Sequence, residues 1–457
     1  MPSTAPDAAP PVGATAELTI DSLSHRGEGV GRLNGCVCFV PGALPGETVG
    51  VRIVQRSRHH CHGDLQTLVR ASDQRQRPPC ILADHCGGCS LQHCTDAAEA
   101  QWKQQRVQEV LQRIGRLHAV PSPIEAGERT LHYRNRAVIP LRRGDDGRLR
   151  AGYYRRGSHR IVNMNQCPVL DPRLDALIAP LKRDLDASDW PADSDVADCK
   201  GLRHLALRVG HYTGEVLITL ISSTGELPGL EVLAHRWQER WPEVVGVTLN
   251  LQPKPNNVVM GETTLGIAGR SWIEESLAGL KLRIASDTFF QVNTPQAERV
   301  VPFLLQALGG ASTGRLVDAY CGIGTYSLPI AQHGWQVVGL ERSGASVDLA
   351  RLNATCNGLA ERCQFQAVDV AAALQEHLVG CDALLLDPPR KGLDATTQQV
   401  ILDNPPTTVL YLSCDPATLA RDLQVLVSTG GYRLEALQPF DFFPQTSHVE
   451  SLAVLRR

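Results

Sequence analysis

The chain has 457 residues, of which 43% are hydrophobic and 20% are charged, and its formal net charge is −3. This composition is typical of a globular protein with two or three domains, and the weakly acidic balance does not by itself indicate nucleic-acid binding. The first residues contain neither a basic start nor an apolar run, and no stretch reaches the length of a membrane span. We therefore expect a cytoplasmic protein without a signal peptide or membrane contact, whose fourteen cysteines are thiols, ligands or catalysts rather than disulfides.

Four regions follow one another along the chain. Residues 1–15 are rich in proline and alanine, which predicts a disordered tail. Residues 16–74 alternate short apolar strands with glycine turns, a pattern typical of a small β-barrel. Residues 75–287 mix a cysteine-rich loop, a polar helix and several strands, which indicates a central α+β domain. Residues 288–457 alternate strands and helices regularly, which predicts a doubly wound α/β domain.

Three cysteines on one short loop, with a fourth far downstream, form a candidate metal centre. Cys80, Cys86 and Cys89 occur as CILADHCGGC, and Cys167 lies in NQCPVL. Ligation by thiolates alone suits either tetrahedral zinc or a [4Fe–4S] cluster, and the spacing alone distinguishes the two only weakly. Cys94 competes with Cys167 for the fourth position.

The segment from Arg129 to Arg160 contains ten arginines with tyrosines and histidines between them. Arginine commonly contacts phosphates, and aromatic rings provide surfaces on which bases stack. The sequence GDDG at residues 144–147 is also a strong turn signal, so the same pattern fits a solvent-exposed hairpin. Nucleic-acid binding and a solvated hairpin therefore both remain open for this segment.

A glycine loop in VDAYCGIGTYSLPIA follows a predicted strand and precedes a predicted helix. Gly322 and Gly324 let the backbone turn sharply and approach a ligand closely. Tyr326 and Ser327 stand where a dinucleotide-binding loop would have its third glycine. The loop therefore favours S-adenosylmethionine, which has no phosphate, over NAD or FAD.

Acidic residues end the three strands that follow this loop. Glu341 in VVGLE can accept ribose hydroxyls, and Asp369 in QAVD is placed to meet an adenine edge. Asp387 in LLLDPPRKG is presented at the carboxyl edge of the sheet, where such folds bind ligands. Turn glycines and helix-capping acids would be the alternative explanation of these residues.

Cys414 lies in YLSCDPATLARD, between an apolar run that predicts a buried strand and a predicted helix. Asp415 and the proline after it are typical of a helix cap and first helical residue. A thiol at this junction is expected beside helix-start N–H groups, which favour the thiolate. Cys414 is therefore a candidate nucleophile, with an inert buried cysteine as the alternative.

Together these segments resemble the S-adenosylmethionine-dependent RNA 5-methyluridine methyltransferases. The matching pieces occur in family order and are CILADHCGGCSLQHC, NQCPVL, DTFFQVN, DAYCGIGTYSLPIA, VGLERS, LLLDPPRKG, LSCDPATLARD and HVESLAVL. The resemblance implies a multidomain fold with an N-terminal TRAM (OB-like) β-barrel and a central RNA-binding domain carrying a [4Fe–4S] cluster. The C-terminal part would be a class I, Rossmann-like methyltransferase domain.

The resemblance also implies roles for individual residues. The cluster ligands would be Cys80, Cys86, Cys89 and Cys167. The residues around the methyl donor would be Gln291, Tyr320, Thr325, Glu341, Asp369 and Asp387. Cys414 would be the nucleophile and Glu450 in HVES the base. Two positions depart from the family pattern: Asp415 replaces a usual asparagine, and Thr325 stands where a close relative has asparagine. An acid beside Cys414 would oppose thiolate formation unless the helix N-terminus compensates.

The implied reaction is methylation of uridine C5 through a covalent bond between Cys414 and C6, after the target base is extruded. Glu450 would remove the C5 proton, with His448 as the rival base. The presence of barrel and cluster favours 23S ribosomal RNA over tRNA as the partner, and no obligate protein partner is indicated. A non-catalytic RNA-binding protein is the alternative from another class. A third possibility is a radical S-adenosylmethionine enzyme. It would need a cluster held by three cysteines with one open iron, usually in a C-x3-C-x2-C run, and C-x5-C-x2-C with Cys167 does not match this.

Overall fold

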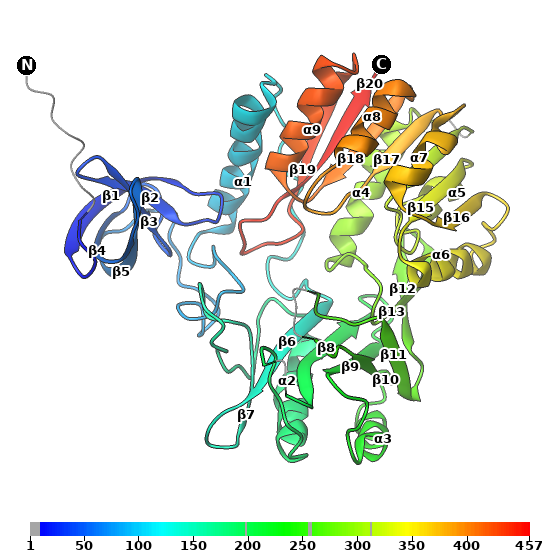
Figure 1. Ribbon diagram of the computed structural model, residues 1–457. Coiled ribbons are helices and arrows are strands. Elements are labelled where there is room, and N and C mark those ends of the chain that lie inside the picture. The colour runs from blue at the N-terminus through cyan, green and yellow to red at the C-terminus, as the bar shows by residue number, and fades with distance from the viewer. Residues whose placement is uncertain (1–9, 197–198, 255–257, 311–312) are drawn as a thin grey trace, which may run out of the picture. The chain divides into compact units, whose positions relative to one another are not determined.

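The computed structural model describes residues 10–196, 199–254, 258–310 and 313–457 (Figure 1). The chain divides into two compact units. The first consists of Met1–Arg106, Arg155–Ser158 and Phe443–His448, and the second of Val107–Tyr154, His159–Phe442 and Val449–Arg457. The predicted disordered tail falls largely on residues 1–9, which lie outside the described residues. The predicted domain boundaries after residues 74 and 287 remain predictions.

A closed five-stranded barrel forms the N-terminal part of the first unit, as predicted. Its strands follow one another around the barrel in the order β1-β2-β3-β5-β4. They are β1 (Thr15–Leu23), β2 (Gly29–Leu33), β3 (Cys36–Val40), β4 (Thr48–Arg56) and β5 (His60–Arg70). Alternate residues such as Leu18, Ile20 and Val51 fill the interior. Gly31 is required for close strand approach, because a Cβ there would lie 2.3 Å from the carbonyl oxygen of Thr19.

The polar helix α1 (Asp96–Val110) follows the cysteine-rich loop, and the π-helix η1 (Leu111–Gly115) continues it. Glu99 and Lys103 form a buried ion pair of 2.6 Å, and Lys103 Nζ also donates to the carbonyl oxygen of Phe443 at 3.1 Å. The backbone N–H of Gln445 donates to Glu99 at 3.1 Å. The loop 443–448 is thereby fastened to α1 within the first unit.

A six-stranded sheet of order β11-β10-β9-β8-β6-β7 forms the central part of the second unit. Its strands are β6 (Arg136–Arg143), β7 (Leu149–Ala151), β8 (Leu202–Val209), β9 (Val216–Ser222), β10 (Val244–Leu251) and β11 (Thr263–Gly269). The helices α2 (Pro172–Asp186) and α3 (Leu230–Arg240) and the hairpin β12 (Trp272–Leu277) with β13 (Leu280–Ala285) accompany it. The GDDG turn joins β6 to β7, so the predicted hairpin of the arginine-rich segment is present.

The C-terminal part is a seven-stranded sheet of order β16-β15-β14-β17-β18-β20-β19, with β14 to β18 parallel and β20 antiparallel to its neighbours. The strands are β14 (Arg315–Ala319), β15 (Gln336–Glu341), β16 (Cys363–Ala367), β17 (Ala383–Leu386), β18 (Thr408–Ser413), β19 (Arg433–Phe440) and β20 (Glu450–Arg456). This is the predicted doubly wound α/β arrangement.

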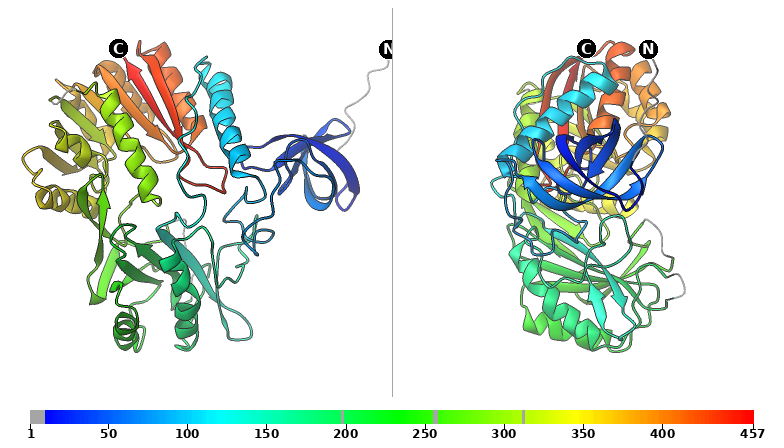
Figure 2. Two further views of the ribbon diagram at one scale, coloured as in Figure 1. Left: turned by 180° about the vertical axis from the view of Figure 1, so that it is seen from behind. Right: turned by 90° about the vertical axis from the view of Figure 1, so that its left-hand side faces the viewer.

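Helices cover both faces of this sheet (Figures 1 and 2). They are α4 (Thr294–Ala307), α5 (Ser327–Gln332), α6 (Gly344–Cys356), α7 (Val370–Leu378), α8 (Ala395–Asp403) and α9 (Pro416–Ser428). One core cluster joins α7, α8 and α9 to the sheet through residues such as Leu374, Ile401 and Leu423. In the described part of the chain, no helix combines the length and apolar character needed to cross a membrane.

Candidate active site

The strand register brings three of the predicted catalytic or donor-site residues to one edge of the C-terminal sheet. Asp387 directly follows β17, and Cys414 directly follows the parallel strand β18. Glu450 begins β20, which runs antiparallel beside β18, and Ser413 pairs with Ser451. The start of β20 therefore lies at the same edge as the ends of β17 and β18. Residues from three separate motifs meet there because of sheet topology alone.

The two carboxyl groups at this edge are both buried. Burial raises the pKa of Asp387 to about 7, and nearby Asp318 contributes to the increase. Burial, and secondly Asp387, raise the pKa of Glu450 to about 8, while Arg390 opposes the shift. A carboxyl group with a pKa near 8 can both hold and release a proton around neutral pH. Once ionised, such a group accepts a proton more strongly than an ordinary carboxylate does.

The environment of Cys414 differs from the sequence-based expectation. Burial first, and then the carboxyl groups of Glu450 and Asp387, raise the pKa of this thiol to about 11. The side chain of Asp415 accepts hydrogen bonds from two backbone N–H groups at the start of α9, at 2.9 and 3.0 Å. Those groups are therefore satisfied by the cap, and Asp415 itself also contributes to raising the thiol pKa. The expectation that the helix start favours the thiolate was wrong for this structure.

The glycine loop lies directly against Glu341 at the end of β15. The backbone N–H of Gly322 donates to Glu341 Oε2 at 3.2 Å, and that of Ser343 donates to Oε1 at 2.8 Å. Gly322 and Gly324 have φ of +55° and +84°, a backbone conformation that L side chains rarely adopt. A carboxylate has about four lone-pair positions, so two remain on Glu341 for ligand hydroxyls. These features fit a ribose-binding corner beside the loop.

The other four residues expected around the methyl donor each have their own surroundings in the structure. The backbone of Tyr320 has φ of +72°, and its hydroxyl is hydrogen-bonded to the side chain of Thr397. Thr325 is buried in the glycine loop. Asp369 is exposed and caps α7 through a 3.1 Å bond, which is the capping role weighed as an alternative. Gln291 is buried between β13 and α4. Their roles toward the donor remain predictions.

No role at this site was assigned from the sequence to two further residues, Asp318 and Tyr326. Asp318 is buried in β14 and accepts a hydrogen bond from Ser327 Oγ, and its burial raises its pKa to about 7 despite that bond. Tyr326 is buried close to Asp387 and Glu450, and its hydroxyl has no hydrogen-bond partner among the described residues. A charged residue inside the apolar run RLVDAY was the signal for Asp318, since buried carboxyl groups are rare.

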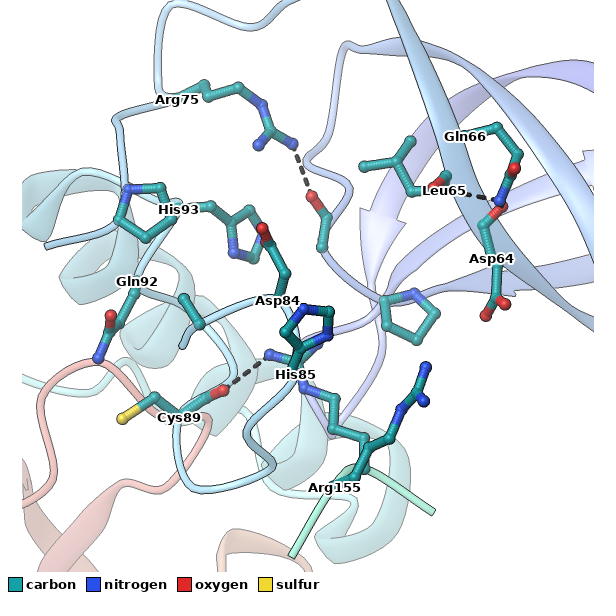
Figure 3. A pocket seen from close by; sticks show the side chains of 15 residues that line it. Asp64, Leu65, Gln66, Arg75, Asp84, His85, Cys89, Gln92, His93 and Arg155 are labelled. Carbon is teal, nitrogen blue, oxygen red and sulfur yellow. Dashed lines mark hydrogen bonds between the residues drawn. The ribbon is translucent and has the colours of Figure 1, made fainter. Parts of the chain in front are cut away.

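The cysteine-rich loop has local features of a thiolate site without a formed metal site. Cys80 Sγ and Cys86 Sγ each accept a backbone N–H bond, from Leu82 and Gly88, at 3.4 Å. Arg156 donates to the carbonyl oxygen of Cys89 at 2.7 Å beside a cavity of about 560 Å³ (Figure 3).

The fourth predicted ligand belongs to the other compact unit. Cys167 is buried there, and its backbone N–H donates to Asp175 at 2.5 Å. Its competitor Cys94 is buried near the loop, and burial raises its thiol pKa to about 12. Within the described ranges, no three or more Cys, His, Asp or Glu side chains are grouped so that they could hold a metal ion. The cluster is therefore not confirmed and stays a prediction.

Comparisons with known proteins cover the whole chain. A family model described as tRNA (Uracil-5-)-methyltransferase matches residues 269–457, and a TRAM-domain model matches residues 11–65. An RNA methyltransferase of Parasynechococcus marenigrum, described as uncharacterized, is 52% identical over 463 residues, which cover 100% of this chain and 99% of that protein. A similarly described protein of Halalkalibacterium halodurans is 36% identical over 446 residues, which are 96% of each chain.

A solved structure with similar architecture is the Pyrococcus abyssi tRNA (uracil-54, C5)-methyltransferase in complex with S-adenosyl-L-homocysteine. Its TM-score is 0.76 at 25% sequence identity, and the match covers 96% of this chain and 100% of that one. The family models account for the N-terminal barrel and the C-terminal parallel sheet, and the relatives extend the similarity over the central sheet between them. The chain belongs to the RNA (uracil-5-)-methyltransferase family with an N-terminal TRAM domain.

Proposed function

We propose that this protein transfers a methyl group from S-adenosylmethionine to C5 of a specific uridine in 23S ribosomal RNA, in the cytoplasm. The observation that carries the proposal is the meeting of Cys414, Glu450 and Asp387 at the edge of the parallel sheet. A nucleophile and a buried proton acceptor at one place are what a covalent route to C5 requires. The family membership supplies the RNA and the position of methylation on uracil.

The chemistry follows from the weak nucleophilicity of uridine C5. The donor supplies an electrophilic methyl group when it is bound. Cys414 loses its thiol proton to water and adds to C6 as the thiolate, and the displaced π electrons form an enolate with electron density at C5. C5 takes the methyl group, Glu450 removes the C5 proton, and the returning electron pair expels Cys414 as thiolate. The products are 5-methyluridine and the demethylated donor, and the target base must leave its stack to reach the site.

The donor would lie along the glycine loop and the neighbouring strand ends. Glu341 would accept the ribose hydroxyls beside Gly322, in agreement with the two unoccupied lone-pair positions of its carboxylate. Gln291, Tyr320, Thr325, Asp369 and Asp387 would complete its surroundings. The Pyrococcus abyssi enzyme, which binds S-adenosyl-L-homocysteine, supports this assignment by its similar fold.

A [4Fe–4S] cluster would be held by Cys80, Cys86, Cys89 and Cys167. The N–H bonds to two of the loop sulfurs support this, because such bonds stabilise negatively charged thiolate ligands. Four cysteine ligands leave no open iron position, so the cluster would serve structure or RNA docking, and no step of methyl transfer depends on it.

A second candidate function is the same reaction on tRNA. It is favoured by the match to a tRNA (uracil-54, C5)-methyltransferase over 100% of that chain. Mass-spectrometric mapping of 5-methyluridine in ribosomal RNA and tRNA, from cells with and without this gene, distinguishes the two. Loss of one 5-methyluridine from 23S RNA supports the proposal, and loss from tRNA alone supports the second candidate. Unchanged modification of both RNAs would refute an RNA methyltransferase role in these cells.

A further inference from the structure

Two arginines lie directly opposite each other in the central sheet. β6 and β8 are antiparallel neighbours, and their register pairs Arg136 with Arg208. Side chains of directly opposed residues project from the same face with Cβ atoms about 5 Å apart, and like charges in that position repel each other. Such an arrangement destabilises the sheet unless something compensates the two charges.

The compensation is missing in the described part of the chain. Arg208 is 3% exposed and donates through Nη2 to the carbonyl oxygen of Thr288 at 2.8 Å, whereas its buried Nε and Nη1 have no partner among the described residues. Arg136 points its Nη2 at the thioether of Met260, 3.6 Å away. Burial, and secondly Arg134, lowers the pKa of Arg136. Burial, and secondly Arg136, lowers the pKa of Arg208, and in both cases Asp287 opposes the shift only in part.

Asp287, whose negative charge acts on both arginines, does not pair with either of them. Asp287 is exposed, and its carboxylate accepts a hydrogen bond from Thr264 at 2.9 Å. No ion pair joins it to Arg136 or Arg208 within the described residues. Because arginine keeps its proton in proteins, the charge of buried Arg208 and that of half-buried Arg136 persist rather than being neutralised. A buried, uncompensated charge is strongly unfavourable, which indicates a missing anionic partner.

Other arginines of the same sheet have carbonyl or carboxylate oxygens that compensate their charge. Arg203, also on β8 and also buried, donates to the carbonyl oxygen of Gln252 at 2.9 Å and has further carbonyl contacts. Arg142, on β6, forms an ion pair of 2.9 Å with Asp193. Among the described residues, Arg136 and Arg208 thus differ from Arg203 and Arg142, because no carboxylate pairs with them and two nitrogens of Arg208 have no partner.

The arginine pair adjoins the segment 288–294, which contains Gln291, one of the residues expected around the methyl donor. Arg208 holds the carbonyl oxygen of Thr288, three residues before Gln291. Next to Arg136, the side-chain amide of Asn135 donates to the carbonyl oxygen of Gln291 at 2.9 Å and to Thr294 Oγ1 at 2.9 Å. An anion bound by the two arginines would thus lie beside residues 288–294.

We propose that Arg136 and Arg208 together bind one backbone phosphate of the RNA substrate, next to the extruded target nucleotide. This inference rests on the RNA methyl transfer proposed above. Guanidinium groups present planar sets of N–H donors that suit phosphate oxygens, and two of them can hold one phosphate from two sides. The phosphate would both neutralise the repelling charges and fix the position of the RNA backbone, without reading sequence.

The test compares Arg208→Met with Arg142→Met, which removes an arginine from the same sheet whose charge is already paired. Thermal unfolding of the full-length protein is measured in sodium chloride and in inorganic phosphate at equal ionic strength. Wild type and Arg142→Met should gain melting temperature in phosphate, and Arg208→Met should gain little. Without phosphate, Arg208→Met should melt no lower than wild type, because the variant removes an uncompensated buried charge.

The RNA fragment identified by the 5-methyluridine mapping provides the second measurement. Its affinity for Arg208→Met should fall by at least about tenfold at low salt, and the slope of log affinity against log salt should be shallower by about one. Wild-type phosphate response and an unchanged slope in Arg208→Met would overturn the proposal. A lower melting temperature with an unchanged slope would show that Arg208 only holds Thr288. If wild type methylates no RNA, the function fails, while the phosphate response still decides whether the pair binds this anion.

Discussion

The edge of the parallel sheet and the cysteine-rich loop were both predicted as functional centres. The structure brings the predicted residues together at the sheet edge but not at the loop. At the sheet edge, Asp387, Cys414 and Glu450 meet because hydrogen-bonded strands fix their positions before any ligand is present. On the loop, the cysteines share a segment but are not grouped as a metal site within the described residues. Thiolates repel one another and are gathered by the metal they bind. Side chains at strand ends are therefore positioned by the fold itself. Cysteines on a loop would instead be brought together by the metal that they bind.

The largest expected effect is at the sheet edge. Cys414→Ala should lower methyl transfer to RNA by at least about a thousandfold, because loss of a covalent nucleophile removes the whole addition step. Binding of S-adenosylhomocysteine, measured by calorimetry, should stay close to wild type. The matched control is Cys356→Ala, which removes an exposed cysteine on α6 and should leave turnover unchanged. Substantial residual activity in Cys414→Ala would show that this thiol is not the nucleophile.

The next effect concerns the cysteine-rich loop. Protein purified without oxygen should be brown and contain about four irons per chain, as expected for a [4Fe–4S] cluster. Cys167→Ala should lose the iron and the visible absorption, whereas Cys94→Ala should keep both. Iron analysis and the absorption spectrum make the comparison. Stoichiometric zinc without iron would contradict the cluster, and iron loss in Cys94→Ala alone would make Cys94 the fourth ligand.

A smaller effect tests the charge environment of Cys414. Burial first, and then the neighbouring acids, raise the pKa of this thiol to about 11, so its alkylation by iodoacetamide should increase as pH rises toward that value. Asp415→Asn removes one of these charges and should move the profile to lower pH. Peptide mass spectrometry follows Cys414, and the exposed Cys356 is the internal reference. A profile unchanged or moved to higher pH would mean that Asp415 does not oppose the thiolate.

The smallest effect separates the cap from the charge at the same position. Asp415→Ala removes both hydrogen bonds to the start of α9 and should lower the free energy of unfolding by about 1 kcal/mol, within the usual 0.5–2 for a lost cap. Asp415→Asn retains a capping oxygen and should stay within about 0.5 kcal/mol of wild type. Urea unfolding followed by circular dichroism gives both values. Equal losses in the two variants would show that the charge, rather than the cap, stabilises the helix.

The sequence predicted the barrel, the doubly wound sheet and the strand-end position of Cys414, because strand and turn patterns are local. It predicted Asp415 as the cap of this helix, but not that the cap would satisfy the same N–H groups that were expected to favour the Cys414 thiolate. Asp318 was missed because its interaction with Ser327 depends on the loop conformation. The Arg136–Arg208 pair was hidden because opposition across β6 and β8 depends on register, which an arginine count does not reveal.

The central claim is a covalent reaction in which Glu450 removes the C5 proton after methylation. Glu450→Gln should therefore still add Cys414 to the base and accept the methyl group, but stall before elimination. Incubation with RNA and S-adenosylmethionine should give a denaturation-resistant protein–RNA band that disappears without the methyl donor or with Cys414→Ala. His448→Ala, the control two residues upstream, should turn over without accumulating this band. Normal turnover of Glu450→Gln, or a trapped band in His448→Ala instead, would contradict the account.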